Sequence, residues 1–405
     1  MIATLPYGRQ SISEEDISAV VDCLRSPFLT VGPRIEAFED AFAKKVGAKH
    51  AIAVCNATAA LHLAMLVAEI RPGDRVVTSP ITFLASANCA AYVGATPDFV
   101  DVDPVSLTID PMVLESSWKQ DTKAVVSVDY AGQSADMPTL AEIARKQGAI
   151  IIEDACHAVG GAFEHNGQIY KMGGHPWADM TTFSFHPVKT MTTGEGGMLV
   201  TDNDVYARKA RLLRSHGMER NHSTFESPEA CFPTAEKGPW FYEMQGLGYN
   251  YRLTEIQAAL GNSQLNRLDS FVERRREIVA AYNAAFINVP WVQIPALRNP
   301  ADQSLTSWHL YSPRLDFAAL GKTRTKVMDE LRQRGVGTQV LYIPVHLQPW
   351  YRKSFGYGQG KCPNAEAAYA GLLSLPLFPE MTQVDVDRVI QSVRILDQKP
   401  NLSCA

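Results

Sequence analysis

The regular alternation of short apolar runs with amphipathic segments from His50 onward constrains the fold of this chain most strongly. The apolar runs that we interpret as strands are 51–55, 75–78, 98–102, 124–128 and 149–152. Helical patterns lie between them at 58–70, 84–93 and 137–147. Strands that alternate with helices in this way are typical of a mostly parallel sheet with helices on its faces. The sequence therefore predicts an α/β fold.

One of these strands runs directly into two acids. Three isoleucines, 150–152, read as a fully buried strand and are followed by Glu153 and Asp154. Open α/β sheets bind ligands at the carboxyl ends of their strands, which makes both acids candidate ligand contacts. Helix N-caps are the structural alternative for them. His157, three residues after Asp154, is placed either to hydrogen-bond that acid or to lie over a cofactor ring.

A single lysine, Lys189, lies in the stretch 181–197. A strand-like segment there breaks at Pro187, and a hydroxyl and glycine run follows the lysine before the next apolar strand, 198–200. A desolvated lysine has a lowered pKa and acts as an amine nucleophile, whereas most loop lysines are plain surface charges. Together with Asp154, however, Lys189 makes the pair that pyridoxal phosphate needs. The lysine holds the aldehyde, and the aspartate keeps the pyridine nitrogen protonated.

Three further features have a functional and a structural interpretation. The small residues of 56–60 join a strand to a helix, where free N–H groups bind phosphate, although a simple Asn or Thr cap also explains them. Ser184 either reaches the same phosphate or satisfies local backbone. Phe83 lies in another strand-to-helix loop, where an aromatic ring stacks on a flat heterocycle or joins the core.

Metal and dinucleotide sites are disfavoured. Four histidines, at 157, 165, 175 and 186, lack the spacing of a zinc motif, so we predict no metal. The glycines at 194, 196 and 197 follow the lysine and do not form GxGxxG between a first strand and its helix.

The composition of the chain indicates which binding partners and which cellular compartment to expect. The net charge is −5 and no basic tract occurs, which argues against nucleic acid and acidic membrane surfaces. Seven dispersed cysteines without CxxC spacing suit reduced thiols, residues 1–10 lack a signal peptide pattern, and no apolar run is long enough to span a bilayer. We therefore expect a cytoplasmic protein that does not enter the membrane.

The rest of the chain suggests its division into domains. Ser13 caps one helix, 35–46 forms a second, and 219–246 reads as a long loop. Thr254 and Gln257 open a long helical run that we expect to break at 261–262 and to end near Phe286. Strands are predicted at 308–315 and 337–342, and helices at 326–334 and 384–396. With 405 residues, the chain is predicted to comprise an N-terminal arm and helix (1–34), a large α/β domain (35–254) and a small α+β domain (255–405).

Several stretches together resemble the DegT-type nucleotide-sugar aminotransferases, and the resemblance runs from Tyr7 to the last helix. They are NATAAL (56–61), SPITFLASAN (79–88), VDYAGQSADM (128–137), EDACHAVGG (153–161), SFHPVKTMTTGEGG (184–197), RSHGM (214–218) and GYNYRLTEIQAALG (248–261). The resemblance implies the fold-type I architecture of pyridoxal 5′-phosphate enzymes. Such enzymes have a seven-stranded, mostly parallel sheet in the large domain and a smaller C-terminal α+β domain.

The resemblance also implies roles for single residues. Lys189 holds the cofactor aldehyde and Asp154 pairs with the pyridine nitrogen, so these two are the expected catalytic residues. The other expected cofactor contacts are Ala57, Thr58, Phe83, His157, Ser184 and Asn250. Of these, Asn250 reaches the phosphate from a partner subunit, which implies a homodimer with shared active sites. The expected substrate contacts are Tyr7, Pro27, Phe28, Leu29, Thr30, Leu341 and Tyr342.

The implied reaction moves an amino group from L-glutamate to C4 of a UDP-4-keto-6-deoxy-N-acetylhexosamine, UDP-4-keto-6-deoxy-L-AltNAc, as in pseudaminic acid biosynthesis. The family's His-Tyr-Lys run near the substrate strand is replaced here by Leu341, Tyr342 and Ile343. Three alternatives stay open. They are transamination of another nucleotide-linked keto sugar at C3 or C4, a sugar dehydratase on the same fold, and a regulatory protein. Dehydratases of this fold carry histidine where this chain has Lys189.

Overall fold

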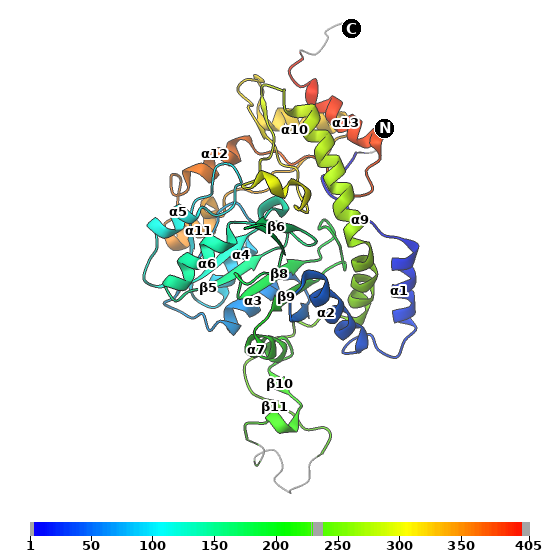
Figure 1. Cartoon of the computed structure of the whole chain (residues 1–405), viewed down its shortest axis with the longest axis vertical. Helices are drawn as coiled ribbons and strands as arrows, with labels where there is room; N and C mark the ends of the chain where they lie inside the picture. The colour runs from blue at the N-terminus through cyan, green and yellow to red at the C-terminus, as the bar shows by residue number, and fades with distance from the viewer. Residues whose placement is uncertain (1–3, 228, 230–237, 399–405) are drawn as a thin grey trace.

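A seven-stranded sheet forms the centre of the molecule in the computed structural model, which describes residues 4–227, 229 and 238–398 (Figure 1). Its strand order is β1-β9-β8-β5-β4-β2-β3. The strands are β1 (His50–Val54), β2 (Arg75–Thr78), β3 (Thr96–Phe99), β4 (Thr122–Val128), β5 (Ile150–Asp154), β8 (Met180–Ser184) and β9 (Gly197–Thr201). Five neighbours, from β3 to β8, pair in parallel, and β9 runs antiparallel to β1 and β8. The predicted α/β fold with a mostly parallel sheet is confirmed.

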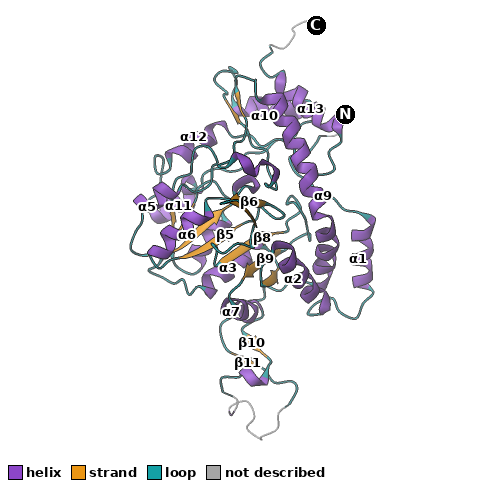
Figure 2. Cartoon of the chain, in the orientation of Figure 1, coloured by secondary structure: helices purple, strands orange, loops and turns teal. Residues whose placement is uncertain are grey.

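Helices cover both faces of this sheet (Figure 2). One face packs on α3 (Ala57–Val67), α4 (Ala85–Tyr92) and α7 (Asp204–Arg214). The other packs on α2 (Pro33–Val46), α5 (Pro111–Ser116), α6 (Met137–Lys146) and the first half of α9 (Glu255–Phe286). Alternate residues of a strand face opposite sides, so Ile151 lies in the second core and Ile152 in the first.

The helix α9 is continuous over 32 residues, so the predicted break at Gly261–Asn262 is wrong. Gly261 serves close packing and does not end the helix, because a Cβ there would lie 2.7 Å from the ring of Phe38 on α2. Asn262 donates from its amide to the carbonyl of Arg34 at 3.2 Å, which also ties α9 to α2.

The small domain packs its core against the second half of α9. Its elements are β12 (Val292–Gln293), β13 (Arg314–Leu315), α10 (Arg324–Gln333) and α13 (Gln383–Arg394). The helices α11 (Pro349–Phe355) and α12 (Pro363–Gly371) pack instead in a further core that includes Phe99 of β3 and Tyr130. The strand predicted at 308–315 is reduced to β13, and 337–342 forms no strand. Tyr311 and Gln339 make only isolated bridges, to Leu375 and Ser374. Tyr311 and Leu375 pack in the core of this domain from irregular backbone, whereas Gln339 is exposed.

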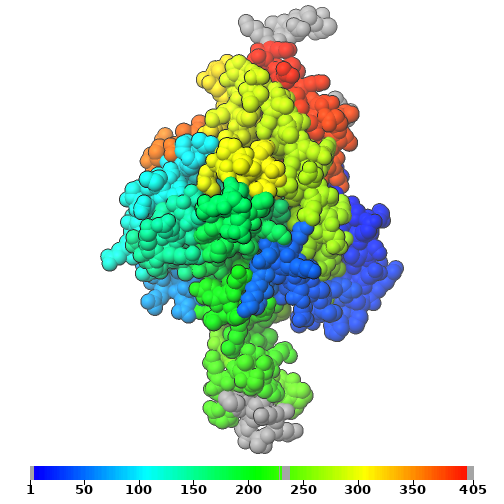
Figure 3. Space-filling model, viewed as in Figure 1, coloured from blue at the N-terminus to red at the C-terminus, as the bar shows by residue number. Residues whose placement is uncertain are grey.

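Two smaller features complete the chain. A hairpin of β6 (Ala162–His165) and β7 (Gln168–Lys171) follows β5, and α1 (Glu14–Leu24) packs beside α9. Of the segment predicted as a long loop, 219–246, residues 228 and 230–237 lie outside the described residues. Its described residues project from the body as an arm (Figure 3). Two short antiparallel strands lie in this arm, β10 (Met218–Glu219), which starts one residue before the segment, and β11 (Glu243–Met244). Among the described helices, none has the length and apolar character needed to cross a bilayer.

The first residue of α9 anchors the start of α2. The carboxylate of Glu255, which is fully buried, accepts the backbone N–H groups of Gly32, Arg34 and Ile35 at 3.0, 2.9 and 3.2 Å. A side-chain carboxylate at a helix N-terminus satisfies free donors and complements the helix dipole. One residue thus joins two long helices.

Replacement of Glu255 by Gln should lower the free energy of unfolding by about 2 kcal/mol. The amide of Gln has an NH2 group in place of one carboxylate oxygen, so backbone N–H groups at the start of α2 lose an acceptor. Chemical denaturation measures the change. Glu277→Gln is the matched control on the same helix: its carboxylate is 54% exposed and pairs with Arg274, so the loss there should stay under about 0.5 kcal/mol. Equal stability of the two variants would contradict the anchoring role.

Candidate active site

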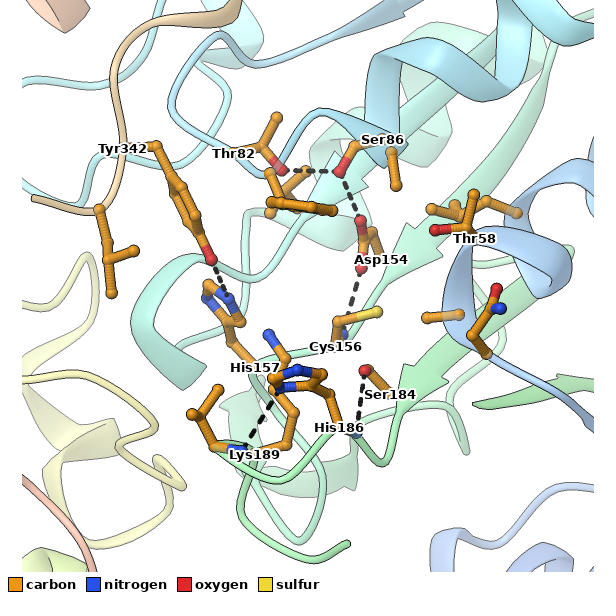
Figure 4. Close-up of a pocket in the computed structure, with 18 of the residues that line it drawn as sticks. Thr58, Thr82, Ser86, Asp154, Cys156, His157, Ser184, His186, Lys189 and Tyr342 are labelled. Carbon is orange, nitrogen blue, oxygen red and sulfur yellow. Dashed lines mark hydrogen bonds between the residues drawn. The ribbon is translucent and has the colours of Figure 1, made fainter. Parts of the chain in front are cut away.

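A cavity of about 510 Å³ opens at the carboxyl ends of β4, β5 and β8. It is bounded by the start of α3, the loop between β2 and α4, and the loop between β8 and β9 (Figure 4). The residues that line it are Tyr7, Asn56, Ala57, Thr58, Leu61, Thr82, Phe83, Ala85, Ser86, Val128, Asp154, Cys156, His157, Ser184, His186, Val188, Lys189, Glu195, Leu341 and Tyr342. The cavity therefore occupies the position at which open α/β sheets bind ligands.

Of the two acids that end β5, only Asp154 faces this cavity. Its Oδ2 accepts the hydroxyl of Ser86 at 2.6 Å and its Oδ1 accepts the backbone N–H of Cys156 at 3.2 Å. Within residues 4–227, 229 and 238–398, no cation pairs with this carboxylate. Glu153 points to the other face of the sheet, where it is bound by Thr181, His175 and the backbone of Gly173. Asp154 is thus a buried carboxylate that two neutral donors hold.

Lys189 lies on the opposite side of the cavity, in the loop between β8 and β9. Hydrogen bonds hold that loop: the backbone N–H of Lys189 donates to His186 at 2.8 Å, and the hydroxyl of Thr192 donates to Phe185 at 3.0 Å. Burial lowers the pKa of the Lys189 amine below the ordinary 10.5, although Cys156 and Asp154 act in the other direction. The lysine is therefore suited to react as a neutral amine.

The N-terminus of α3 presents free donors to the same cavity. The side chain of Asn56 caps the N–H of Ala59 at 2.9 Å, and the N–H groups of Ala57 and Thr58 in the first turn have no partner within the helix. Ser184, the last residue of β8, lines the same cavity, and its hydroxyl accepts the N–H of His186 at 3.4 Å. Gly197 permits this arrangement, because a Cβ there would lie 2.5 Å from the carbonyl carbon of Asn56. Such a group of donors is typical of an anion site.

His157 and Tyr342 form one wall of the cavity. His157 accepts the N–H of Ala131 at Nδ1, so its neutral ring carries the proton at Nε2 and donates to the Tyr342 hydroxyl at 3.1 Å. Burial, helped by the charge of Lys189, holds the pKa of His157 well below its usual range. The ring of Phe83, 57% exposed, lies with its centre 6.3 Å from that of Tyr342.

Most of the residues predicted from the sequence line this one cavity. They are Tyr7, Ala57, Thr58, Phe83, Asp154, His157, Ser184, Lys189, Leu341 and Tyr342. The others do not line it. The stretch 27–30 lies between α1 and α2, where the carbonyl of Leu29 accepts from Glu255, and Asn250 is exposed at the base of the arm.

Sequence reasoning missed Thr82, Ser86, Cys156 and Glu195, which also line the cavity. The only available signal was the spacing of Thr82 and Ser86, two hydroxyls four residues apart around Phe83. No group of three metal-binding side chains gathers anywhere in the described part of the chain.

Comparison with known proteins identifies the family. The model of the DegT/DnrJ/EryC1/StrS aminotransferase family matches residues 10–394. The chain belongs to this aminotransferase family. Among its relatives, the spore coat polysaccharide biosynthesis protein SpsC of Bacillus subtilis (strain 168) is 42% identical over 391 residues, which is 96% of each chain. The uncharacterized protein MJ1066 of Methanocaldococcus jannaschii is 39% identical over 390 residues, which is 96% of this chain and 97% of that protein.

Solved structures of the family share the whole fold. PseC of Helicobacter pylori, an aminotransferase involved in the biosynthesis of pseudoaminic acid, is 30% identical with a TM-score of 0.85, and the match covers 97% of this chain and 99% of PseC. The putative sugar aminotransferase Spr1654 of Streptococcus pneumoniae, in its PLP-form, is 28% identical with a TM-score of 0.85, and the match covers 97% and 98% of the two chains. The expected fold-type I architecture is confirmed by these neighbours.

The lowered pKa of Lys189 predicts how its reactivity depends on pH. The neutral amine reacts, so the rate rises with pH and levels off above the pKa, which for Lys189 lies below 10.5. Trace labelling of the cofactor-free protein with acetic anhydride, followed by peptide mass spectrometry, gives this profile. Lys146 is the internal control: its hydrogen bond with Glu142 raises its pKa, so its profile should lie at higher pH. Coinciding profiles would contradict a desolvated Lys189.

Proposed function

We propose that this chain transfers an amino group from L-glutamate to C4 of a UDP-linked 4-keto-6-deoxy-N-acetylhexosamine, with UDP-4-keto-6-deoxy-L-AltNAc as substrate. The cofactor is pyridoxal 5′-phosphate. The observation that carries the proposal is the pairing of a nucleophilic lysine with a buried carboxylate across one cavity, Lys189 on one side and Asp154 on the other. The likeness to PseC supports the choice of sugar.

The residues of the cavity suit this cofactor. An uncompensated carboxylate, Asp154, matches a protonated ring nitrogen, and the donors of Ala57, Thr58 and Ser184 match a phosphate. Phe83 offers a flat face for the ring, and His157 completes the cofactor contacts while holding Tyr342. When bound, pyridoxal phosphate supplies an aldehyde that carries the amino group and a ring that accepts electrons.

Lys189 moves protons in both halves of the reaction. As a neutral amine, its Nζ removes the proton from Cα of L-glutamate; the amino group stays on the cofactor, one water is consumed, and the carbon skeleton leaves as 2-oxoglutarate. In the second half the same atom delivers a proton to C4 of the sugar, the amino group bonds to C4, and the ketone oxygen leaves as water. The charge on Asp154 is fixed in place throughout, which stabilises the positive ring nitrogen without reorganisation.

The sugar nucleotide, the second substrate, enters through the outer part of the cavity, where the side chains are less polar. Tyr7, Leu341 and Tyr342 line the outer part of the cavity in this proposal, and Tyr7 is held there because its carbonyl accepts the N–H of Leu377 at 3.0 Å. Apolar walls recognise a 6-deoxy sugar through its methyl group.

A second copy of the chain completes the site in this proposal. Asn250 and the stretch 27–30 are absent from the lining of their own cavity, and residues 28 and 29 are exposed apolar side chains. We assign Asn250 to the phosphate in the cavity of a partner subunit and 27–30 to the partner's sugar nucleotide. The active unit is accordingly a homodimer.

A different keto sugar is the second candidate substrate. The identity to SpsC, a protein of spore coat polysaccharide biosynthesis, is 42%, against 30% to PseC. In sequence identity alone, this difference favours transfer to C3 or C4 of another nucleotide-linked sugar over transfer to UDP-4-keto-6-deoxy-L-AltNAc. A dehydratase is disfavoured because Lys189 occupies the reactive position.

The two half-reactions can be observed separately in visible absorbance. Protein loaded with pyridoxal phosphate should be yellow, bleach with L-glutamate and regain its colour with UDP-4-keto-6-deoxy-L-AltNAc. Lys189→Ala should hold no covalently linked cofactor, so borohydride should fix none to the protein, and Asp154→Asn should bleach about a hundredfold more slowly. Bleaching without recovery would move the substrate to another nucleotide sugar, and a protein that never colours would refute the proposal.

Shared sites predict complementation between two inactive variants. In a hybrid of Lys189→Ala with Asn250→Ala, one of the two sites combines an intact lysine with an intact asparagine from the other subunit. Random mixing should therefore restore about one quarter of the wild-type activity, because half of the dimers are hybrids. An inactive mixture whose hybrids are verified by mass spectrometry would show that each chain uses its own residues.

A further inference from the structure

Two hydroxyl groups extend from Asp154 along the wall of the cavity in an unbroken hydrogen-bonded chain. The hydroxyl of Thr82 lies 2.6 Å from that of Ser86, which in turn lies 2.6 Å from Oδ2 of Asp154 (Figure 4). All three side chains are buried, with exposed fractions of 3, 1 and 5%. Buried polar groups are stable only when they have hydrogen-bond partners, and here each of the three groups is a partner of the next.

The direction of the chain follows from the charge of its last member. An ionised carboxylate only accepts, so Ser86 donates to Asp154, and the oxygen of Ser86 is left to accept the proton of Thr82. Each donation polarises the next, which strengthens the bond that reaches the carboxylate. Bonds to ionised acceptors are also the short ones, in agreement with the 2.6 Å at Oδ2.

The same chain reaches a second residue of the site. Thr82 lies on the loop that enters α4, just before Phe83, and Ser86 lies in the first turn of α4, which begins without a side-chain cap at Leu84. Their mutual hydrogen bond closes this turn, while Ser86 fastens it to the end of β5. The loop that presents Phe83 and the strand that presents Asp154 are therefore joined through two hydroxyls.

We propose that Ser86 and Thr82 are positioning residues for the cofactor ring. Ser86 holds Oδ2 of Asp154, which fixes the carboxylate plane and leaves its remaining lone pairs for the ring nitrogen. Thr82 holds Ser86 and, with it, the spacing between Asp154 and the face of Phe83. This inference rests on the proposed pairing of Asp154 with the pyridine nitrogen.

Ser86→Ala removes the donor without changing the size of the site by more than one atom. We expect the dissociation constant for pyridoxal phosphate to rise about tenfold, from the loss of a bond to a charged group. At saturating cofactor, the visible circular dichroism per bound molecule should fall, because a ring that is free to tilt gives a weaker signal. The kcat should drop more than the KM for the sugar.

Two further variants keep the test decisive. Thr82→Val, which keeps the shape of the side chain, should show the same changes to a smaller extent, and Ser86→Thr should restore the signal by restoring the hydroxyl. Ser374→Ala is the matched control: Ser374 is equally buried and bonds to the hydroxyl of Ser312 at 2.7 Å, outside the cavity. It should bind and orient the cofactor as the wild type does.

The outcomes distinguish a failure of this inference from a failure of the proposed pairing of Asp154 with the pyridine nitrogen. If Ser86→Ala and Thr82→Val match the wild type in affinity and dichroism while Asp154→Asn is impaired, the hydroxyl chain has no positioning role. If Asp154→Asn also matches the wild type, the pairing of Asp154 with the ring nitrogen is wrong. If Ser374→Ala is impaired as much as Ser86→Ala, the effect is one of stability and the inference is overturned.

Discussion

The pleat of β5 decides where the chemistry of this protein lies. Successive side chains of a strand face opposite sides, so Ile152 and Asp154 share one face while Ile151 and Glu153 share the other. A slip of one residue would exchange the two acids and aim Glu153 at the cavity. Register is protected because the two acids have different partners: Glu153 is bound by His175, Thr181 and the backbone of Gly173 on its face, and Asp154 by Ser86 on the other. These contacts determine which carboxylate meets the ligand.

Much of this fold and site was predictable, because the decisive patterns are local. A run of apolar residues that ends in acids, at 150–154, places those acids at a known edge of a parallel sheet. Lys189 was identified by its setting between two strands, and the structure brings it to the same cavity as Asp154. Resemblance to a family added the remaining contacts. Those at 27–30 and Asn250 do not line the cavity of their own chain, and their proposed roles in a second chain stay predictions.

The failures of prediction share a physical cause, since each depends on what a residue touches across the fold. Gly261 resembles a helix breaker until the ring of Phe38 is seen against it. The run at 308–315 resembles a strand, yet only its last two residues pair in a ladder, as β13 with β12, while Trp308 and Tyr311 pack in the core from irregular backbone. Ser86 resembles any small helical residue, and only its distance to Asp154 reveals its place in the site.

The uninterrupted course of α9 affects how the molecule melts. Leu265, Leu268 and Val272 belong to the core under the sheet, whereas Tyr282 and Phe286 belong to the core of the small domain. At 1.5 Å per residue the helix spans about 48 Å, with no break at which one part can unwind alone. When either core unfolds, one half of α9 loses the side chains that pack against it. The shared helix therefore couples the two domains into one cooperative unfolding unit.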